Sequence, residues 1–461
     1  MLKFVYFVLC IFALAGVARA QDDKTKNAAL PAQFSAPPRA YVNGQWYDGA
    51  GFRRRTLYVV AGVFTSQKPK TDFETVDLQN GYVLPPLGDA HCHHFDSVQT
   101  GQTLVPQYLK DGVFYAQSLG NGTSARRRPD VMAFFNRPIG VDVTYADAAL
   151  TSTLGHPFLI YESLANGFYG QPGIGDVREK VRNLRKGEGE TYRFVETPEM
   201  LARVWPLVLQ RPPDVLKIML LESDRYEEKR AKAEPGDNGL PPEIVPEIVK
   251  RAHAAGLRVY AHVENAYDFH VCVASGVDAL AHLPGYAMGN RSEDKYLLEE
   301  ADVKAFGKRG GVITPTTWLA PFYTGTKEYP HALEQVRQTQ KHNLTLLKKY
   351  GVRIAIGSDS YGTGPWPEAE YLRGLGVFTD AELVKIWCET PAVIFPRRKI
   401  ARLENGYEAS FIVVGSDPTQ DLLRLHDIRL RVKQGVLVPT PQPSEAAKPN
   451  GVSGHEPFPD L

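Results

Sequence analysis

Short apolar runs alternate with amphipathic segments through the middle of the chain, from residue 84 to residue 400. The runs are short enough for buried strands, and the segments between them repeat apolar residues at helical spacing. Strands are expected at 215–220, 258–263, 278–283, 311–316 and 353–358, with weaker signals near Val113 and Val141. About eight strands that alternate with helices predict parallel βαβ units.

One helix shows the pattern most clearly. Apolar residues recur three and four positions apart from Ile244 to Ala252, and Gly256 follows as a C-terminal stop signal. The strand expected at 215–220 precedes this helix, and the strand at 258–263 follows it directly. This order is that of one complete βαβ unit.

The two ends of the chain have a different pattern, with short alternating runs that indicate antiparallel strands. Residues 41–83 contain the turn dipeptides Asn-Gly, Asp-Gly and Asn-Gly, and a second β-rich stretch lies within 401–438. We expect these two segments to form one composite β-domain. The predicted fold class is therefore α/β: a (β/α)8 TIM barrel at 84–400 with a small β-sandwich-like domain formed from both chain ends.

The first twenty residues predict a cleavable signal peptide. Lys3 precedes an apolar run to Ala18, and Ala18-Arg19-Ala20 is a small-residue cleavage site. The run is shorter than the roughly 20 residues of a membrane-spanning helix, so an uncleaved anchor is the weaker alternative. We expect export to the periplasm or secretion, a flexible lead at 21–40, a flexible tail at 439–461 and no integral membrane segment after cleavage.

Composition and charge exclude some classes of partner. The 461 residues carry 53 lysines and arginines against 52 acidic residues, a net charge of +1, so nothing favours nucleic acid or an anionic membrane. After cleavage the chain would keep Cys92, Cys272 and Cys388, an odd number that indicates thiols packed in the core and no disulfide framework. A small-molecule substrate is the expected partner, and a homo-oligomer is compatible with the sequence.

Two histidines stand where the first barrel strand should end. His91 and His93 follow an apolar segment that begins at Tyr82. Residues two apart on a strand point to the same face. Neutral imidazole is the commonest protein ligand of zinc-like ions, so the pair is a candidate bidentate metal site.

Four further residues fit the same chemistry. Lys217 interrupts the apolar strand at 215–220, where an uncompensated charge is costly. His262, His282 and Asp359 each end an expected strand. In a barrel of this kind the C-terminal strand ends meet at one mouth, where active sites are built. The six residues together indicate a metal-dependent active site.

These residues lie in motifs that resemble the amidohydrolase superfamily, and within it the imidazolonepropionase-like and prolidase-like group. The resemblance extends from about Tyr82 to Val438. The motifs are PPLGDAHCH at 85–93, DVLKI at 214–218, AHAAGLRVYAH at 252–262, GVDALAH at 276–282, IGSD at 356–359 and GYEASFIVVGSDP at 406–418.

The resemblance implies two divalent metal ions, with zinc expected, and it implies a role for each residue. Ligands of the first ion would be His91, His93 and Asp359, and ligands of the second would be His262 and His282. Lys217 would carry a carbamate and bridge both ions. A metal-bound hydroxide would attack the substrate, and Asp359 would act as general base and then general acid.

Some positions depart from the family pattern or have weaker assignments. Cys92 stands where a larger apolar residue is usual, and we interpret it as a packing residue. Ser410 replaces an acidic residue that is common in the closing motif. His156 and Tyr226 are candidates for substrate binding, although a solvated loop around Tyr226 is the alternative. His94 is expected to have a surface or hydrogen-bonding role.

The leading hypothesis is a metal-dependent amidohydrolase that cleaves an amide, peptide-like or cyclic amide bond of a small molecule. A dipeptide or an N-acyl amino acid is the favoured substrate. A lactonase or phosphotriesterase-like hydrolase with the same site is the first alternative. The second is an exported binding protein without catalytic activity, which is disfavoured because degenerate relatives usually lose metal ligands and all six positions are present here.

Overall fold

The computed structural model describes residues 36–169, 176–285, 293–324 and 332–439. The predicted signal peptide, most of the predicted lead and nearly all of the predicted tail lie outside these residues. In the described part of the chain, no helix has the length and apolar character needed to cross a bilayer.

The middle of the chain forms a barrel of parallel strands. In chain order these are β6 (Leu87–Cys92), β7 (Val113–Ser118), β8 (Asp142–Tyr145), β9 (Ala149–Thr151), β11 (Leu216–Met219), β12 (Val259–His262), β13 (Ala279–Ala281), β14 (Val312–Thr314) and β15 (Arg353–Ile354). The first three pair in the order β6-β7-β8, and the others in the order β9-β11-β12-β13-β14-β15. An additional strand, β10 (Tyr192–Phe194), pairs with β9.

Two seams close the barrel. The segment that follows β15 lies beside β6, because Ala90 N donates to Ile356 O (2.8 Å) and His93 N donates to Ser360 O (3.0 Å). At the other seam, β8 pairs with β7, and β9, which follows β8 closely in the chain, pairs with β11. We treat β8 and β9 as two parts of one interrupted strand. With β8 and β9 counted as one strand, the sheet has the eight strands of a (β/α)8 barrel, and the predicted fold class is confirmed.

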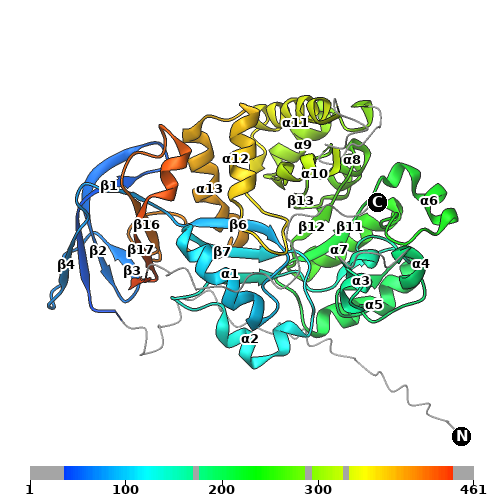
Figure 1. Ribbon diagram of the computed structural model, residues 1–461, viewed down its shortest axis with the longest axis horizontal. Coiled ribbons are helices and arrows are strands. Elements are labelled where there is room, and N and C mark those ends of the chain that lie inside the picture. The colour runs from blue at the N-terminus through cyan, green and yellow to red at the C-terminus, as the bar shows by residue number, and fades with distance from the viewer. Residues whose placement is uncertain (1–35, 170–175, 286–292, 325–331, 440–461) are drawn as a thin grey trace, which may run out of the picture.

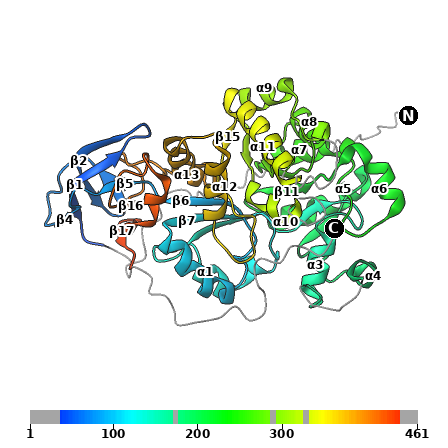
Figure 2. The ribbon, with the colours of Figure 1, turned by 45° about the horizontal axis from the view of Figure 1, so that its top comes forward.

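Helices surround the strands (Figures 1 and 2). They are α1 (Val98–Lys110), α2 (Pro129–Phe134), α3 (Phe158–Ala165), α4 (Val177–Val181), α5 (Pro198–Gln210), α6 (Tyr226–Lys232), α7 (Val245–Ala254), α8 (Ala266–Ser275), α9 (Glu300–Lys308), α10 (Ala320–Thr324), α11 (Ala332–Lys349), α12 (Trp366–Leu375) and α13 (Asp380–Ile394). The apolar face predicted for the helix at 244–252 is the buried face of α7. Gly256 then adopts φ +73°, a left-handed conformation that suits the turn into β12.

Strands from the two ends of the chain form one sheet, which Figure 1 shows as blue and orange ribbons side by side. The early strands are β1 (Arg39–Tyr47), β2 (Phe52–Val60), β3 (Val63–Thr65), β4 (Glu74–Asp77) and β5 (Tyr82–Leu84), and the late strands are β16 (Phe411–Val414), β17 (Ile428–Lys433) and β18 (Val436–Leu437). The order is β18-β17-β16-β5-β1-β2-β3, with β4 on β1. Val83 of β5 is the junction, because it pairs with Trp46 of β1 and with Val413 of β16.

The sheet begins slightly earlier than the sequence predicts. Arg39 and Ala40 were expected in the flexible lead, but both belong to β1. The Nε of Arg39 lies 2.7 Å from Glu74 Oε2 on β4, and a second guanidinium nitrogen donates to the carbonyl of Gly435. Through these contacts the start of β1 is fixed to β4, an early strand, and to the turn between β17 and β18, two late strands.

The sheet is fixed to the barrel by buried charges. Lys433 Nζ, at the end of β17, lies 2.6 Å from Asp142 Oδ1 at the start of β8. Arg398 contacts both Asp142 and Glu408, at 2.7 and 2.6 Å. Removal of one partner from such a buried set would leave an uncompensated charge, so the contacts fix how the two parts pack together.

Candidate active site

The residues expected to carry the chemistry meet at the C-terminal ends of the barrel strands. His91 lies near the end of β6, Lys217 lies within β11 and His262 ends β12. His282 follows β13, and Asp359 follows β15. All but Asp359 are almost completely buried, and the Asp359 side chain is 15% exposed. The barrel therefore converts five distant positions into one side-chain cluster.

Asp359 contacts three of the histidines. Its Oδ1 lies 2.9 Å from His93 Nε2 and 3.1 Å from His91 Nε2, and its Oδ2 lies 3.6 Å from His282 Nδ1. The two histidine Nε2 atoms of the HxH pair are 3.1 Å apart, a separation at which both can face one cation. The backbone assists, because the amide of Asp359 donates to the carbonyl of His91.

The rings of His282, His262 and His156 form a second group, which begins beside this carboxylate. The ring centroids of His282 and His262 are 4.5 Å apart, and those of His262 and His156 are 4.6 Å apart. His282 Nδ1 lies 2.7 Å from Thr316 Oγ1, and the Thr316 hydroxyl also lies 2.8 Å from the carbonyl of Pro315. If the hydroxyl donates to that carbonyl, it accepts from His282 Nδ1 and leaves the other ring nitrogen of His282 able to bind a metal.

Burial keeps these imidazoles neutral. It lowers the pKa of His262 to about 3, with a further contribution from the charge of Lys217. It also lowers the pKa of His91, His282 and His156 well below the usual value. A neutral imidazole has a free lone pair, which is the form that binds a metal ion.

Lys217 contributes a buried amine to the site. Its Nζ is buried and has no hydrogen-bond partner among the described residues. Burial lowers the pKa of this lysine to about 7, while the negative charge of Asp359 opposes the shift. An amine with this pKa is partly neutral near pH 7, and a buried amine without a partner is costly unless something else satisfies it.

Three residues at this mouth have strained backbones. His282, Thr316 and Asp359 have φ values of +85°, +51° and +45°. Residues other than glycine rarely adopt this left-handed region, and β-branched residues such as threonine do so least readily. Such backbone strain tends to occur at functional sites, where it helps to orient a side chain.

The donor set fits a divalent metal ion. Ligand atoms of His91, His282 and Asp359 all lie within 4.8 Å of one another. His91 Nδ1 is also buried without a partner among the described residues. Nitrogen and oxygen donors of this kind suit zinc and similar ions.

The other histidines and Cys92 are held by local contacts. His94 is buried between the Ser360 carbonyl and the Tyr108 hydroxyl, each at 2.8 Å, so its hydrogen-bonding role is confirmed. The thiol of Cys92 donates to the carbonyl of Gln117. His253 and His270 contact aspartates on the outside of the barrel.

The two candidates for substrate binding have different surroundings. His156 lies inside the cluster, beside His262. Tyr226 is buried at the start of α6, where its hydroxyl lies 3.4 Å from Glu196 Oε1. No contact joins Tyr226 to the histidine cluster within the described part of the chain.

Sequence reasoning missed two residues at the mouth. Glu264 Oε1 lies 2.9 Å from His262 Nε2, and the ring of Tyr361 stacks on His93 with centroids 5.0 Å apart. Each follows a predicted site residue by two positions, like His93 after His91. Both share the two-residue spacing, but they lie beyond the strand ends, where strand periodicity does not determine the direction of a side chain.

The comparisons with known proteins agree with this geometry. The model of the Amidohydrolase family matches residues 217–451, about half of the chain. No curated protein matches the sequence.

Solved structures with the same fold are similar over most of the chain. A putative prolidase from Bifidobacterium longum is 20% identical with a TM-score of 0.63, over 89% of this chain and 96% of its own. The ochratoxinase of A. niger is 19% identical with a TM-score of 0.64, over 92% and 100%. A Xaa-Pro dipeptidase with bound methionine is 16% identical with a TM-score of 0.64, over 87% and 99%. The chain belongs to the amidohydrolase family and is a hydrolase that acts on carbon–nitrogen bonds.

Proposed function

We propose that this hydrolase cleaves an amide bond in a small peptide-like molecule and uses two divalent metal ions to do so. The ions would be held by His91, His93, Lys217, His262, His282 and Asp359. One observation carries the proposal: Lys217 Nζ is buried without a partner, close enough to the neutral histidines to shift their pKa values.

A carbamate on Lys217 would remove the cost of burying an amine that has no hydrogen-bond partner among the described residues. The neutral amine attacks carbon dioxide, a nitrogen–carbon bond forms and one proton leaves, so that a buried amine becomes an anion with two oxygens. The oxygens of this carbamate would serve as metal ligands, which would satisfy the anion in a site where an unpaired charge would be costly. The lowered pKa of Lys217, about 7, supplies the neutral amine that this step requires.

Asp359 is the residue best placed to move protons. When bound, the ions polarise the substrate carbonyl and lower the pKa of a water molecule towards about 7. Asp359 Oδ1, beside His91 and His93, can take a proton from that water and pass it to the leaving nitrogen. The Asp359 side chain is 15% exposed, so a substrate could reach this carboxylate.

A dipeptide or an N-acyl amino acid is the substrate class that we propose. Support comes from the structural likeness to prolidases, one of them complexed with N-methylphosphonate-L-proline, and to a Xaa-Pro dipeptidase. His156 is partly exposed and lies beside His262, where it could contact a bound substrate.

A substrate panel tests this function. Metal-loaded protein would be assayed with Xaa-Pro dipeptides, N-acyl amino acids, a lactone and a phosphotriester. Turnover of at least one amide substrate, lost in Asp359→Asn, is the expected result. Turnover of only the lactone or the phosphotriester would favour the alternative hydrolases. A metal-loaded protein that turns over none of them, yet binds one, would indicate a binding protein.

A further inference from the structure

The barrel has a cavity at the end opposite the histidine cluster. This cavity, of about 360 Å³, is lined at the N-terminal ends of four neighbouring strands, β12 to β15. Arg258 stands just before β12, Asp278 just before β13, and Arg353 begins β15. The histidine cluster lies at the other ends of these strands, so the cavity does not belong to the active site.

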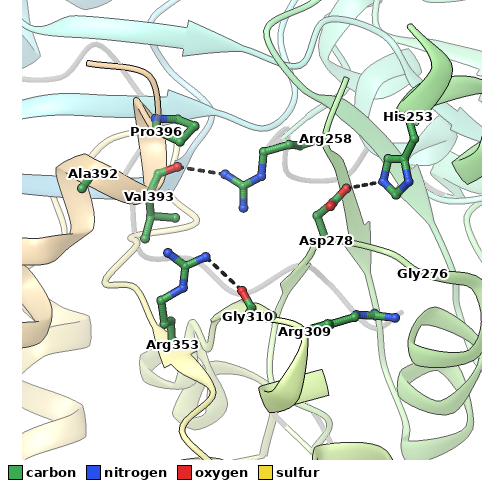
Figure 3. Close-up of a pocket in the computed structure, with 11 residues that line it drawn as sticks. His253, Arg258, Gly276, Asp278, Arg309, Gly310, Arg353, Ala392, Val393 and Pro396 are labelled. Carbon is green, nitrogen blue, oxygen red and sulfur yellow. Dashed lines mark hydrogen bonds and ion pairs between the residues drawn. The ribbon is translucent and has the colours of Figure 1, made fainter. Parts of the chain in front are cut away.

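Two arginines face the space in this cavity (Figure 3). Arg258 Nη1 donates to the carbonyl of Val393 at 3.1 Å, and Arg353 Nη2 donates to the carbonyl of Gly310 at 2.9 Å. Each contact uses one of the five N–H donors of a guanidinium, and it holds the group in place from one side. The guanidinium of Arg258 also lies over the ring of Tyr260, 5.4 Å from its centroid.

These charges lack carboxylate partners. In the described part of the chain, no acidic oxygen lies within ion-pair distance of Arg258, Arg309 or Arg353, although ion pairs are common elsewhere in the protein. Arg309 is a third lining arginine, and its Nη atoms donate to the carbonyls of Val273 and Val277. It points away from the other two in Figure 3 and contributes charge to the cavity rim.

The acidic residue that lines the cavity is already engaged. Asp278 Oδ2 lies 2.8 Å from His253 Nε2 and accepts from the backbone amide of Val259 at 2.7 Å. Figure 3 shows the carboxylate turned towards His253. Three arginines therefore outnumber the single aspartate, and the cavity has an excess of positive charge.

We propose that this cavity binds a small doubly charged anion, inorganic phosphate or a phosphate monoester, between Arg258 and Arg353. Guanidinium groups match the oxygens of phosphate in charge and in donor geometry. Two guanidinium groups on separate strands can approach different oxygens of one tetrahedral group. The site is distant from the catalytic residues, so its occupancy would stabilise the fold without contributing to bond cleavage.

Calorimetric titration of the full-length, metal-loaded protein tests the site. Inorganic phosphate and glycerol 3-phosphate are the two probes, and their relative affinities tell which source the cavity prefers. We expect at least one to bind, and Arg258→Gln with Arg353→Gln to weaken that binding at least tenfold. Arg203→Gln removes an exposed arginine of α5 and should leave the affinity unchanged. Absence of binding of both probes, or a double variant that binds as the unmodified protein does, would overturn the proposal.

A second variant keeps the arginines and fills the cavity. Ala392 lines it from the last turn of α13, and Ala392→Glu would place a carboxylate among the arginines with little loss of helix propensity. This variant should fold and lose phosphate binding. Lys217→Ala should bind phosphate normally, whatever its effect on metals. Loss of binding in Lys217→Ala but not in Ala392→Glu would place the phosphate at the metal site and contradict the proposal.

Discussion

Asp359 Oδ1 lies 2.9 Å from His93 Nε2, although the two residues are 266 positions apart in the sequence. The contact follows from closure of the barrel, which sets the segment after β15 against β6. The backbone amide of Asp359 also bonds to the carbonyl of His91. The main chain of Asp359 is therefore fixed independently of the charge on its side chain.

Asp359→Asn should keep the fold but lose turnover. The amide preserves the size of the side chain and one oxygen, but it cannot accept the proton. General acid–base groups typically contribute about 10²- to 10⁴-fold, so kcat should fall at least about a hundredfold. Metal content, circular dichroism and kcat would be measured on one preparation. A folded, metal-loaded variant within a few-fold of normal kcat would remove Asp359 from the mechanism.

Lys217→Ala should reduce metal content from two ions per chain to one or none. A short carboxylic acid that enters the vacated space should restore part of the metal, because it supplies the two oxygens of the proposed carbamate. Lys433→Met is the matched control, since Lys433 is also a buried lysine on a strand but pairs with Asp142. It should lower stability and leave the metal content unchanged. Two ions and full activity in Lys217→Ala would exclude a bridging role.

Thr316→Val should weaken metal binding through His282. The substitution keeps the β-branched shape at a position with φ +51° and removes the oxygen that lies 2.7 Å from His282 Nδ1. Loss of such an orienting partner commonly lowers metal affinity about 10- to 100-fold. Titration with a chelator would measure the change. Thr339→Val is the control, because the Thr339 hydroxyl is buried without a partner among the described residues and its loss should not affect the metal.

Glu368→Gln should alter how stability depends on pH. Burial raises the pKa of Glu368 from 4.5 to about 8, so between these values the folded protein holds a proton that the unfolded chain has released. The stability contribution of this group therefore falls as pH rises from 4.5 to 8. The variant does not titrate, so its stability relative to the unmodified protein should increase over this window and level off above pH 8.

Denaturation midpoints at pH 5, 6.5 and 8 would measure the Glu368 effect. The control is Glu389→Gln, which removes an exposed carboxylate of α13 and for which the difference from the unmodified protein should be nearly constant. A constant difference for Glu368→Gln as well would show that the buried carboxyl does not change its protonation state in this range.

The sequence predicts most residues of the cluster because they lie at the ends of apolar strands, which can be recognised in the sequence. His91, His262 and His282 each follow a short apolar run, and parallel strands bring such ends to one mouth. The barrel strands near Val113 and Val141 gave weaker signals, yet β7 and β8 are both present. Buried polar residues interrupt the apolar run in both strands: Gln117 and Ser118 in β7, and Asp142 and Thr144 in β8.

Loop contacts could not be predicted in the same way. The positions of Glu264 and Tyr361 depend on backbone turns after the strand ends, where periodicity gives no information. Tyr226 was considered for the substrate pocket because its loop follows Lys217, but the start of α6 directs its hydroxyl to Glu196. The arginines of the cavity at the other end of the barrel stand singly in the sequence and come together only when β12 and β15 lie in one sheet.

The pairing of β5 with β16 has a consequence for how the protein is made. A ribosome completes β5 early, but Val413, the partner of Val83, is synthesised only after the whole barrel. At about 5–20 residues per second, that delay lasts tens of seconds. During this time β5 is an uncovered edge able to pair with another nascent chain. The late strands cover this edge of β5, so a chaperone that shields β5 until β16 arrives should increase the yield of native protein.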